Sequence, residues 1–336
     1  MPSLVKSDPF LRNHLIRDAI GQALYEGMRD DSAIHLFGEG AEVKVHYDAP
    51  QIEADFQDRI HTLPISEDGN TNFAVGASLL GVKPVVDVIA GDFLYRTLDS
   101  IANTAAKLDF VSGVEHTIVI RAEFLIGGPT TGQRPEALFA HIPGLRVVVP
   151  STPRDAYGLM HTALHSPGVT LFFEDRMILD EDIEEDDLHF HLGGAVGSRG
   201  PIPFASAYPR NHWWKEGIWP PDVTVLAYGV MRERTEAVVR SVEGKVDFLD
   251  LRTLYPLDWT AIRSSVRGSK RLLIVEPDVA YGGVGAEIVA TIAEEMPGVR
   301  VRRLGAPRAT IPASASLHAQ MLPTSEEIAR GITDWD

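Results

Sequence analysis

Residues 145–173 read LRVVVPSTPRDAYGLMHTALHSPGVTLFF, and this stretch decides the fold class because it holds one complete strand–helix–strand unit. The apolar run 145–149 predicts a strand, residues 153–165 predict a helix, and residues 170–173 predict a second strand. A helix between two apolar strands is typical of a parallel sheet with helices on both faces.

The same alternation continues on both sides of this unit. Before it, the apolar periodicity predicts a helix over 15–28, strands at 34–37, 84–89 and 117–121, helices at 72–80 and 93–107, a long polar loop at 41–60 and a glycine-rich loop at 127–132. After it, strands at 223–227, 246–249, 271–275 and 299–304 alternate with helices at 232–242, 259–266 and 285–295. The chain is therefore expected to be an α/β protein.

A break in the alternation divides the chain into two expected domains. From Gly193 to Pro221 the sequence is rich in glycine, proline and aromatic residues, which indicates a linker. We predict domains at 1–192 and 222–336, with the linker at 193–221. The linker holds three tryptophans, which we expect to be buried at a domain or subunit interface because aromatic side chains bury large apolar areas: Trp213, Trp214 and Trp219.

Composition excludes several classes of function. The 336 residues are 44% hydrophobic and carry a formal net charge of -16, which disfavours binding to nucleic acid. The chain has no cysteine, so disulfides, thiolate nucleophiles and cysteine metal sites are excluded. No apolar run approaches the roughly 20 residues of a membrane span, and the N-terminal residues lack the order of a signal peptide. We expect a cytoplasmic protein that does not contact membranes.

Several short motifs point to other kinds of site, but none is complete. GPTTGQ at 128–133 lacks the Gly-Lys-Ser/Thr of a nucleotide loop. Gly282, Gly283 and Gly285 half-match a dinucleotide fingerprint, and we interpret them as close packing at a helix N-terminus. The acidic residues of 178–190 are contiguous, which indicates a solvated segment. The histidines form no zinc motif, so no protein-bound metal is predicted.

An ordered series of motifs resembles one family along nearly the whole chain. LPISE (63–67) and FAVGA (73–77) lead to FAHIPGL (139–145), VPSTP (149–153), FFE (172–174), DLRTL (250–254), PLD (256–258) and LPT (322–324). This order and spacing resembles the beta subunits of thiamine-diphosphate-dependent pyruvate and branched-chain 2-oxoacid dehydrogenases. The resemblance implies a pyrimidine-binding domain of the transketolase-like type followed by a transketolase C-terminal-like domain.

The resemblance also implies a cofactor shared with a partner. Beta subunits of this family pair with alpha subunits, usually as an α2β2 heterotetramer, and the alpha subunit holds Mg²⁺ and the diphosphate of thiamine diphosphate. By resemblance, Glu67 hydrogen-bonds N1′ of the aminopyrimidine and favours the imino tautomer, which takes the proton from C2. Phe93 falls where the family stacks an aromatic ring on the pyrimidine, and Asp92 beside it either contacts the cofactor or caps a helix.

One departure from the family changes the expected chemistry. Where the family has a histidine that assists substrate and acyl transfer, this chain has Thr131, which cannot carry a proton near neutral pH. Arg134 stands where a small polar residue is usual. We expect Arg134, next to Gln133, to bind a carboxylate or phosphate of the substrate, or else to form a surface ion pair.

The sequence therefore favours an enzyme, and two alternatives stay open. The first expectation is a beta subunit of a thiamine-diphosphate-dependent 2-oxoacid dehydrogenase, an oxidoreductase that decarboxylates a 2-oxoacid and transfers the acyl or aldehyde unit, with a lipoyl acyltransferase as a further partner. Thr131 and Arg134 also allow a two-subunit, transketolase-like ketol transferase acting on a ketose. The third possibility is a catalytically degenerate subunit that completes an assembly.

Overall fold

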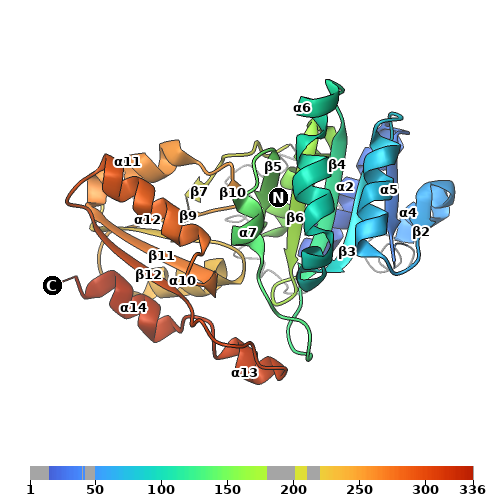
Figure 1. Ribbon diagram of the computed structural model, residues 1–336. Helices are drawn as coiled ribbons and strands as arrows, with labels where there is room; N and C mark the ends of the chain where they lie inside the picture. Colours follow the sequence, from blue (N-terminus) through green and yellow to red (C-terminus); the bar gives the residue numbers. More distant parts are fainter. Residues whose placement is uncertain (1–14, 40, 42–49, 180–200, 210–219, 336) are drawn as a thin grey trace, which may run out of the picture.

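A computed structural model describes residues 15–39, 41, 50–179, 201–209 and 220–335. Figure 1 shows two sheets side by side, each covered by helices on both faces, with the second half of the chain forming the sheet at the left. Both sheets are mostly parallel, so the predicted α/β class is confirmed.

The first sheet has seven strands in the order β10-β5-β6-β4-β3-β1-β2. All its neighbours are parallel except β10, which pairs antiparallel with β5. Its strands are β1 (Ile34–Gly38), β2 (Ile60–Thr62), β3 (Lys83–Ala90), β4 (Thr117–Phe124), β5 (Leu145–Val148), β6 (Gly168–Asp175) and β10 (Thr253–Tyr255). The helical segments of this half are α2 (Ile16–Asp30), α4 (Pro50–Phe56), η2 (Gln57–Arg59), α5 (Glu67–Ser78), η3 (Gly91–Thr97), η4 (Ser100–Thr104), η5 (Ala105–Lys107), α6 (Leu108–Ser112), α7 (Glu136–Ala140) and α8 (Pro153–His165).

The second sheet has five strands in the order β12-β11-β8-β9-β7, with β7 antiparallel at the edge. Its strands are β7 (Tyr208–Pro209), β8 (Val223–Ala227), β9 (Val246–Asp250), β11 (Arg271–Val279) and β12 (Arg300–Ala306). The helices of this half are α10 (Val230–Ser241), α11 (Trp259–Ser269), α12 (Val284–Glu295), α13 (Ala315–Ala319) and α14 (Ser325–Thr333).

Two apolar cores, one on each face, run across both sheets. In β4, Val119 joins one core, whereas Ile118 and Ile120 join the other. In β8, Val225 joins the same core as Val119, and Leu226 joins the same core as Ile118 and Ile120. This follows from the alternation of side chains along a strand, and it explains why these strands are apolar on both faces. Because each core contains residues of both halves, the two domains pack as one body.

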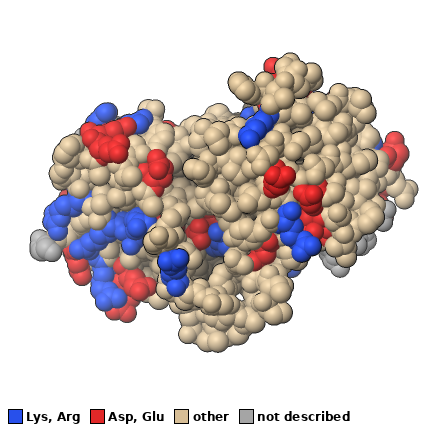
Figure 2. Space-filling model, viewed as in Figure 1, with Lys and Arg blue, Asp and Glu red and all other residues tan. Residues whose placement is uncertain are grey.

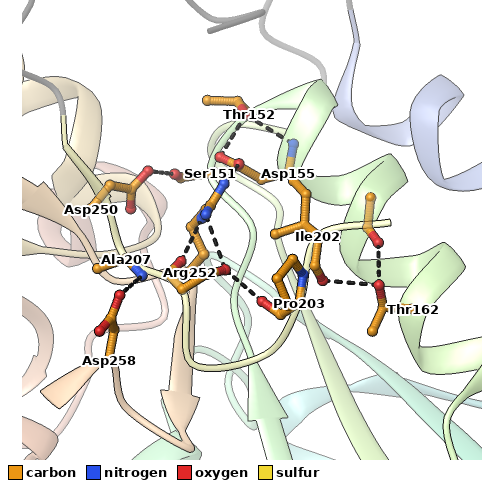
Figure 3. Close-up of polar contacts among 12 residues, drawn as sticks. Ser151, Thr152, Asp155, Thr162, Ile202, Pro203, Ala207, Asp250, Arg252 and Asp258 are labelled. Carbon is orange, nitrogen blue, oxygen red and sulfur yellow. Dashed lines mark hydrogen bonds and ion pairs between the residues drawn. The ribbon is translucent and has the colours of Figure 1, made fainter. Parts of the chain in front are cut away.

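Polar contacts fix the seam between the domains (Figure 3). The guanidinium of Arg252 donates to Asp155 Oδ1 at 2.7 Å, and its Nε donates to the carbonyl of Ser206 at 2.9 Å. Ser151 donates to Asp250 at 2.5 Å. All three contacts join segments far apart in sequence and lie next to β10, the strand that the C-terminal half contributes to the first sheet.

Two expectations about local structure were wrong. The segment expected as one helix over 93–107 is instead a series of 3₁₀ and π turns. Within η3, the buried residues Gly91, Leu94 and Thr97 recur every third position, which is the period of a 3₁₀ helix. The segment 41–60 is not a plain loop: α4 buries Ile52 completely, and Ile60 begins β2. Of the three glycines at the start of α12, Gly283 and Gly285 do pack closely, since a Cβ would lie 2.5 Å and 2.8 Å from the carboxylate oxygens of Glu276, whereas Gly282 has open space around it.

Other expectations fall on residues outside the described part of the chain. These are the tryptophans 213, 214 and 219, most of the linker, residues 42–49, and the acidic segment from Asp180 onward. The domain boundaries at 192 and 222 stay predictions. Among the helices that the structure describes, none is long and apolar enough to cross a membrane.

Candidate functional site

Glu67 is the first residue of α5, and the serine before it caps the helix. The Ser66 side chain accepts a hydrogen bond from the backbone N–H of Gly69 at 3.3 Å, which satisfies a free donor of the first turn. The Glu67 side chain is buried, and its Oε2 lies 3.3 Å from Nε of Arg96. Because the Arg96 side chain is 73% exposed, solvent screens this ion pair, and the carboxylate remains open to another partner.

A second carboxylate lies beside Glu67. Glu39 Oε1 accepts a hydrogen bond from the backbone N–H of Ser66 at 3.0 Å, and burial, followed by the negative charge of Glu67, raises the pKa of Glu39. Asp87 is buried nearby, and its Oδ2 has no hydrogen-bond partner among the described residues. In the part of the chain that the structure describes, three carboxyl groups without a buried cation among them make this corner favourable for a ligand that brings hydrogen-bond donors.

The 3₁₀ segment η3 connects this corner to a loop on its other side. Side chains three positions apart lie on one face of a 3₁₀ helix. Gly91, Leu94 and Thr97 form the buried face. Phe93 and Arg96 share a second face, the one at which Arg96 meets Glu67. Asp92 and Tyr95 share the third. Phe93 is half-buried beside the core and lies on the face of η3 nearest the Glu67 carboxylate.

Asp92 holds the glycine-rich loop in place. Its two carboxylate oxygens accept hydrogen bonds from the backbone N–H groups of Gly132 and Gln133, each at 3.0 Å. Asp92 is itself 7% exposed, so these bonds form away from water. Both carboxylate oxygens of Asp92 thus bind the loop rather than capping a helix, and Asp92 positions the residues that follow Thr131.

Thr131 and Gln133 line a cavity, but neither side chain offers a titratable group. The Thr131 hydroxyl donates to the carbonyl of Gly127 and closes the loop on itself. The Gln133 side chain is exposed at the cavity mouth. Residues 127–132 do form a loop, as the sequence predicted. The hydroxyl of Thr131 stabilises the conformation of this loop.

Arg134 lies in a buried ion-pair cluster, so the expectation of a surface ion pair was wrong. Its Nη2 is 2.9 Å from Asp175 Oδ2, its Nε is 3.2 Å from Glu136 Oε1, and its guanidinium stacks 3.9 Å from the centre of the Phe124 ring. The side chain is 7% exposed. Burial would lower the pKa of Arg134, but the charges of Asp175 and Glu136 outweigh it and raise that pKa.

The second domain completes the cluster. The hydroxyl of Tyr228 donates to Glu136 Oε1 at 3.3 Å, and the backbone N–H of Val230, at the start of α10, donates to Asp175 Oδ2 at 3.2 Å. A helix N-terminus stabilises such a carboxylate. Arg134 therefore joins the two domains, and two carboxylates already occupy its guanidinium.

A cavity of about 370 Å³ opens between the loop and the second domain. It is lined in part by polar side chains from both halves of the chain: Tyr95, Thr131, Gln133, Arg134, Asp278 and His318. Sequence reasoning missed Tyr95, Asp278 and His318 because no motif surrounds them. The sequence placed the loop and the start of η3, with Asp92 and Phe93, in the site, and folding adds the residues that the C-terminal half supplies.

The wall contributed by β11 has carboxyl groups that bind protons tightly. Burial, and next the charge of Glu136, raise the pKa of Asp278 from 3.8 to about 8. Burial also raises the pKa of Glu276, to about 7, against a lowering by its hydrogen bond from the backbone of Gly285. At neutral pH Asp278 is therefore mostly protonated and Glu276 about half protonated. Because Asp278 lines the cavity, the cavity holds less negative charge than its residue types suggest.

This raised pKa predicts a specific dependence of stability on pH. The folded chain keeps a proton on Asp278 that the unfolded chain releases, so stability should fall as pH rises from about 4 to about 8. Asp278→Asn, which cannot ionise, should show a shallower decline in urea-unfolding free energy between about pH 5 and about pH 8. The exposed Glu294→Gln serves as control and should keep the wild-type slope. An unchanged slope in Asp278→Asn would contradict the raised pKa.

Among the described residues, no group of three or more histidine, aspartate or glutamate side chains is arranged to hold a metal ion.

Two family models match the chain. The one described as the pyrimidine binding domain of transketolase matches residues 14–181, and the one described as the transketolase C-terminal domain matches residues 218–328.

Full-length relatives agree with both models. The 2-oxoisovalerate dehydrogenase subunit beta 2, mitochondrial, of Arabidopsis thaliana is 31% identical over 290 residues, covering 82% of this chain and 76% of that protein. The pyruvate dehydrogenase E1 component subunit beta-2, mitochondrial, of Oryza sativa subsp. japonica is 31% identical over 332 residues, covering 94% and 84%. A pyruvate dehydrogenase E1 component subunit beta of Gracilaria tenuistipitata var. liui is 33% identical, covering 83% and 84%.

Solved structures extend the likeness to the fold. A split-gene transketolase, described as an inactive beta4 tetramer, superposes with a TM-score of 0.77 at 18% identity, covering 96% of this chain and 98% of that one. Transketolase from Leishmania mexicana gives a TM-score of 0.69 at 14% identity, covering 96% of this chain and 45% of that one. The predicted order of two transketolase-like domains is confirmed.

Proposed function

The chain belongs to the family of beta subunits of thiamine-diphosphate-dependent 2-oxoacid dehydrogenases, and from this premise we propose that it activates the cofactor for decarboxylation of a 2-oxoacid through Glu67. The observation that carries the proposal is the Glu67 corner. In this corner the buried carboxylate of Glu67 is open to a further partner. It faces the side of η3 that carries Arg96 and Phe93.

The residues of this corner fit the aminopyrimidine end of thiamine diphosphate. That ring offers N–H donors, and the corner has the unpartnered Asp87 Oδ2 together with Glu67. Phe93 supplies an aromatic surface that can stack on a flat ring and exclude water. When bound, the cofactor supplies the carbanion-stabilising chemistry of 2-oxoacid decarboxylation.

The chain's own residues then have separate tasks in this proposal. Glu67 holds a proton at the ring nitrogen of the pyrimidine, since a buried carboxylate can share a proton with a hydrogen-bonded partner. Asp92 fixes the loop 127–134 through two backbone N–H groups, so the cavity keeps its shape during turnover. The cavity lined by Gln133 and Thr131 would receive the 2-oxoacid.

A partner subunit is part of the proposal. The corner described above provides no cluster for Mg²⁺ and diphosphate, which in this proposal an alpha subunit contributes. Apolar side chains project from the α5 and α6 side of the first domain, as expected of a protein interface: Ile65, Phe73, Leu80, Phe110 and Val111. Figure 2 shows the projecting α6 region as largely uncharged. An α2β2 complex would bury this surface.

Calorimetric titration with thiamine diphosphate and Mg²⁺ tests the proposal. The chain alone should bind the cofactor weakly or not at all, and the complex with its co-purified alpha subunit should bind it tightly. Tight binding by the chain alone would contradict the shared site. Absence of binding by the complex would overturn the proposed function.

A further inference from the structure

His318 brings an ionisable group into the cavity from a distant part of the sequence. It lies in the short helix α13, is 6% exposed, and lines the same cavity as Thr131. A Cβ placed on Gly132 would lie 3.0 Å from His318 Cε1 and 3.2 Å from its Nδ1. The imidazole therefore packs directly against the loop, next to Thr131.

The imidazole is poised to bind something that the described residues do not supply. His318 Nδ1 is buried, and no residue in the described part of the chain forms a hydrogen bond with it. A buried polar atom without a partner is unfavourable, so each one calls for an explanation such as a bound water, a ligand or a catalytic role. Thr131 does not meet this need in the structure, because its hydroxyl donates to the carbonyl of Gly127 and forms no hydrogen bond with His318 Nδ1.

Ionisable groups from several elements lie near His318. Arg134, Asp175 and Asp92 act on it electrostatically, and Asp278 of β11 lines the same cavity. Burial, and next the charge of Arg134, lower the pKa of His318, while Asp175 and Asp92 oppose them. The ring is therefore neutral at physiological pH, with one nitrogen able to accept a proton and the other able to donate a hydrogen bond.

We propose that His318 is the catalytic acid–base of the substrate cavity, acting at the carbonyl oxygen of the 2-oxoacid in place of Thr131. Neutral His318 takes the proton from the substrate oxygen as the carbonyl group of the product is re-formed. The resulting imidazolium returns that proton to the carbonyl oxygen of the next substrate, and for the first substrate the neutral ring takes its proton from solvent, so protons balance over each turnover. This inference rests on the proposed function, since it assigns a residue to that same reaction.

The test compares His318→Asn with His116→Asn in the reconstituted complex. His116 is a matched control: it is 4% exposed, neither ring nitrogen has a partner within residues 15–39, 41, 50–179, 201–209 and 220–335, and it lies at the opposite end of β4 from the loop. His318→Asn should lower kcat by about 10²–10⁴-fold and abolish the acid limb of the pH–rate profile, with cofactor affinity unchanged. His116→Asn should keep the wild-type profile.

A second readout does not depend on turnover. In the isolated chain, the imidazole Cε1–H resonance that disappears in His318→Asn should titrate below the ordinary histidine pKa of about 6.5, and 2-oxobutyrate should shift that resonance. His318→Gln serves as a second variant if the asparagine variant unfolds. Wild-type rates and profiles in both variants, with an active complex, would overturn this inference alone. A wild-type complex that binds no thiamine diphosphate would instead overturn the proposed function.

Discussion

Replacing Glu67 by glutamine is expected to lower the turnover number of the assembled complex by about 10²–10⁴-fold while the subunits still associate. Glutamine keeps the size of the side chain and can donate and accept hydrogen bonds, but it cannot take up a proton. The loss should therefore appear in kcat for the 2-oxoacid. Assembly should persist because the apolar α5 and α6 side chains that would meet a partner remain in place.

The control for this variant is another glutamate in the first turn of a helix. Glu287 lies in the first turn of α12 and is exposed, so Glu287→Gln changes the same type of residue in the first turn of a helix outside the Glu67 corner. Turnover is measured with pyruvate and with 2-oxoisovalerate, and assembly by size-exclusion chromatography. Equal turnover by wild type and Glu67→Gln would favour a catalytically degenerate subunit.

Local patterns predicted most of the fold. The helix α8 and the strand β8 have the predicted bounds, because each is a strongly apolar, periodic segment. The pattern failed at η3, where the core-facing residues recur every three positions instead of 3.6. It also failed at β10, where a segment of the C-terminal half completes the first sheet.

Part of the candidate site was predicted from the sequence, and part became visible only in the structure. Glu67, Asp92 and Phe93 lie in one short region of sequence that a family motif marks, and the structure gathers them around η3. His318 and Asp278 reach the cavity only through the packing of the second domain on the loop. Residues that only the packing of two domains brings together have no characteristic spacing in the sequence. The sequence therefore did not identify His318 and Asp278 as residues of the cavity.

The ion-pair cluster at Arg134 leads to the largest expected effect on stability. Arg134→Met should lower the free energy of unfolding by about 3–5 kcal/mol, because it leaves Glu136 and Asp175 buried without their cation. Burial already raises the pKa of Glu136, which Arg134 opposes, so loss of the guanidinium removes the main compensation. Urea unfolding of the isolated chain measures the change.

Two further variants show whether this effect comes from the cluster. Arg263 pairs with Glu295 at 2.6 Å on the surface, and Arg263→Met should leave stability unchanged within error because water screens exposed pairs. Adding Asp175→Asn to Arg134→Met should restore part of the loss, since one unpaired buried charge is removed. If Arg134→Met were as stable as wild type and lost only affinity for the 2-oxoacid, Arg134 would be a substrate ligand. Its engagement by two buried carboxylates argues for the structural outcome, with substrate protonation left to His318.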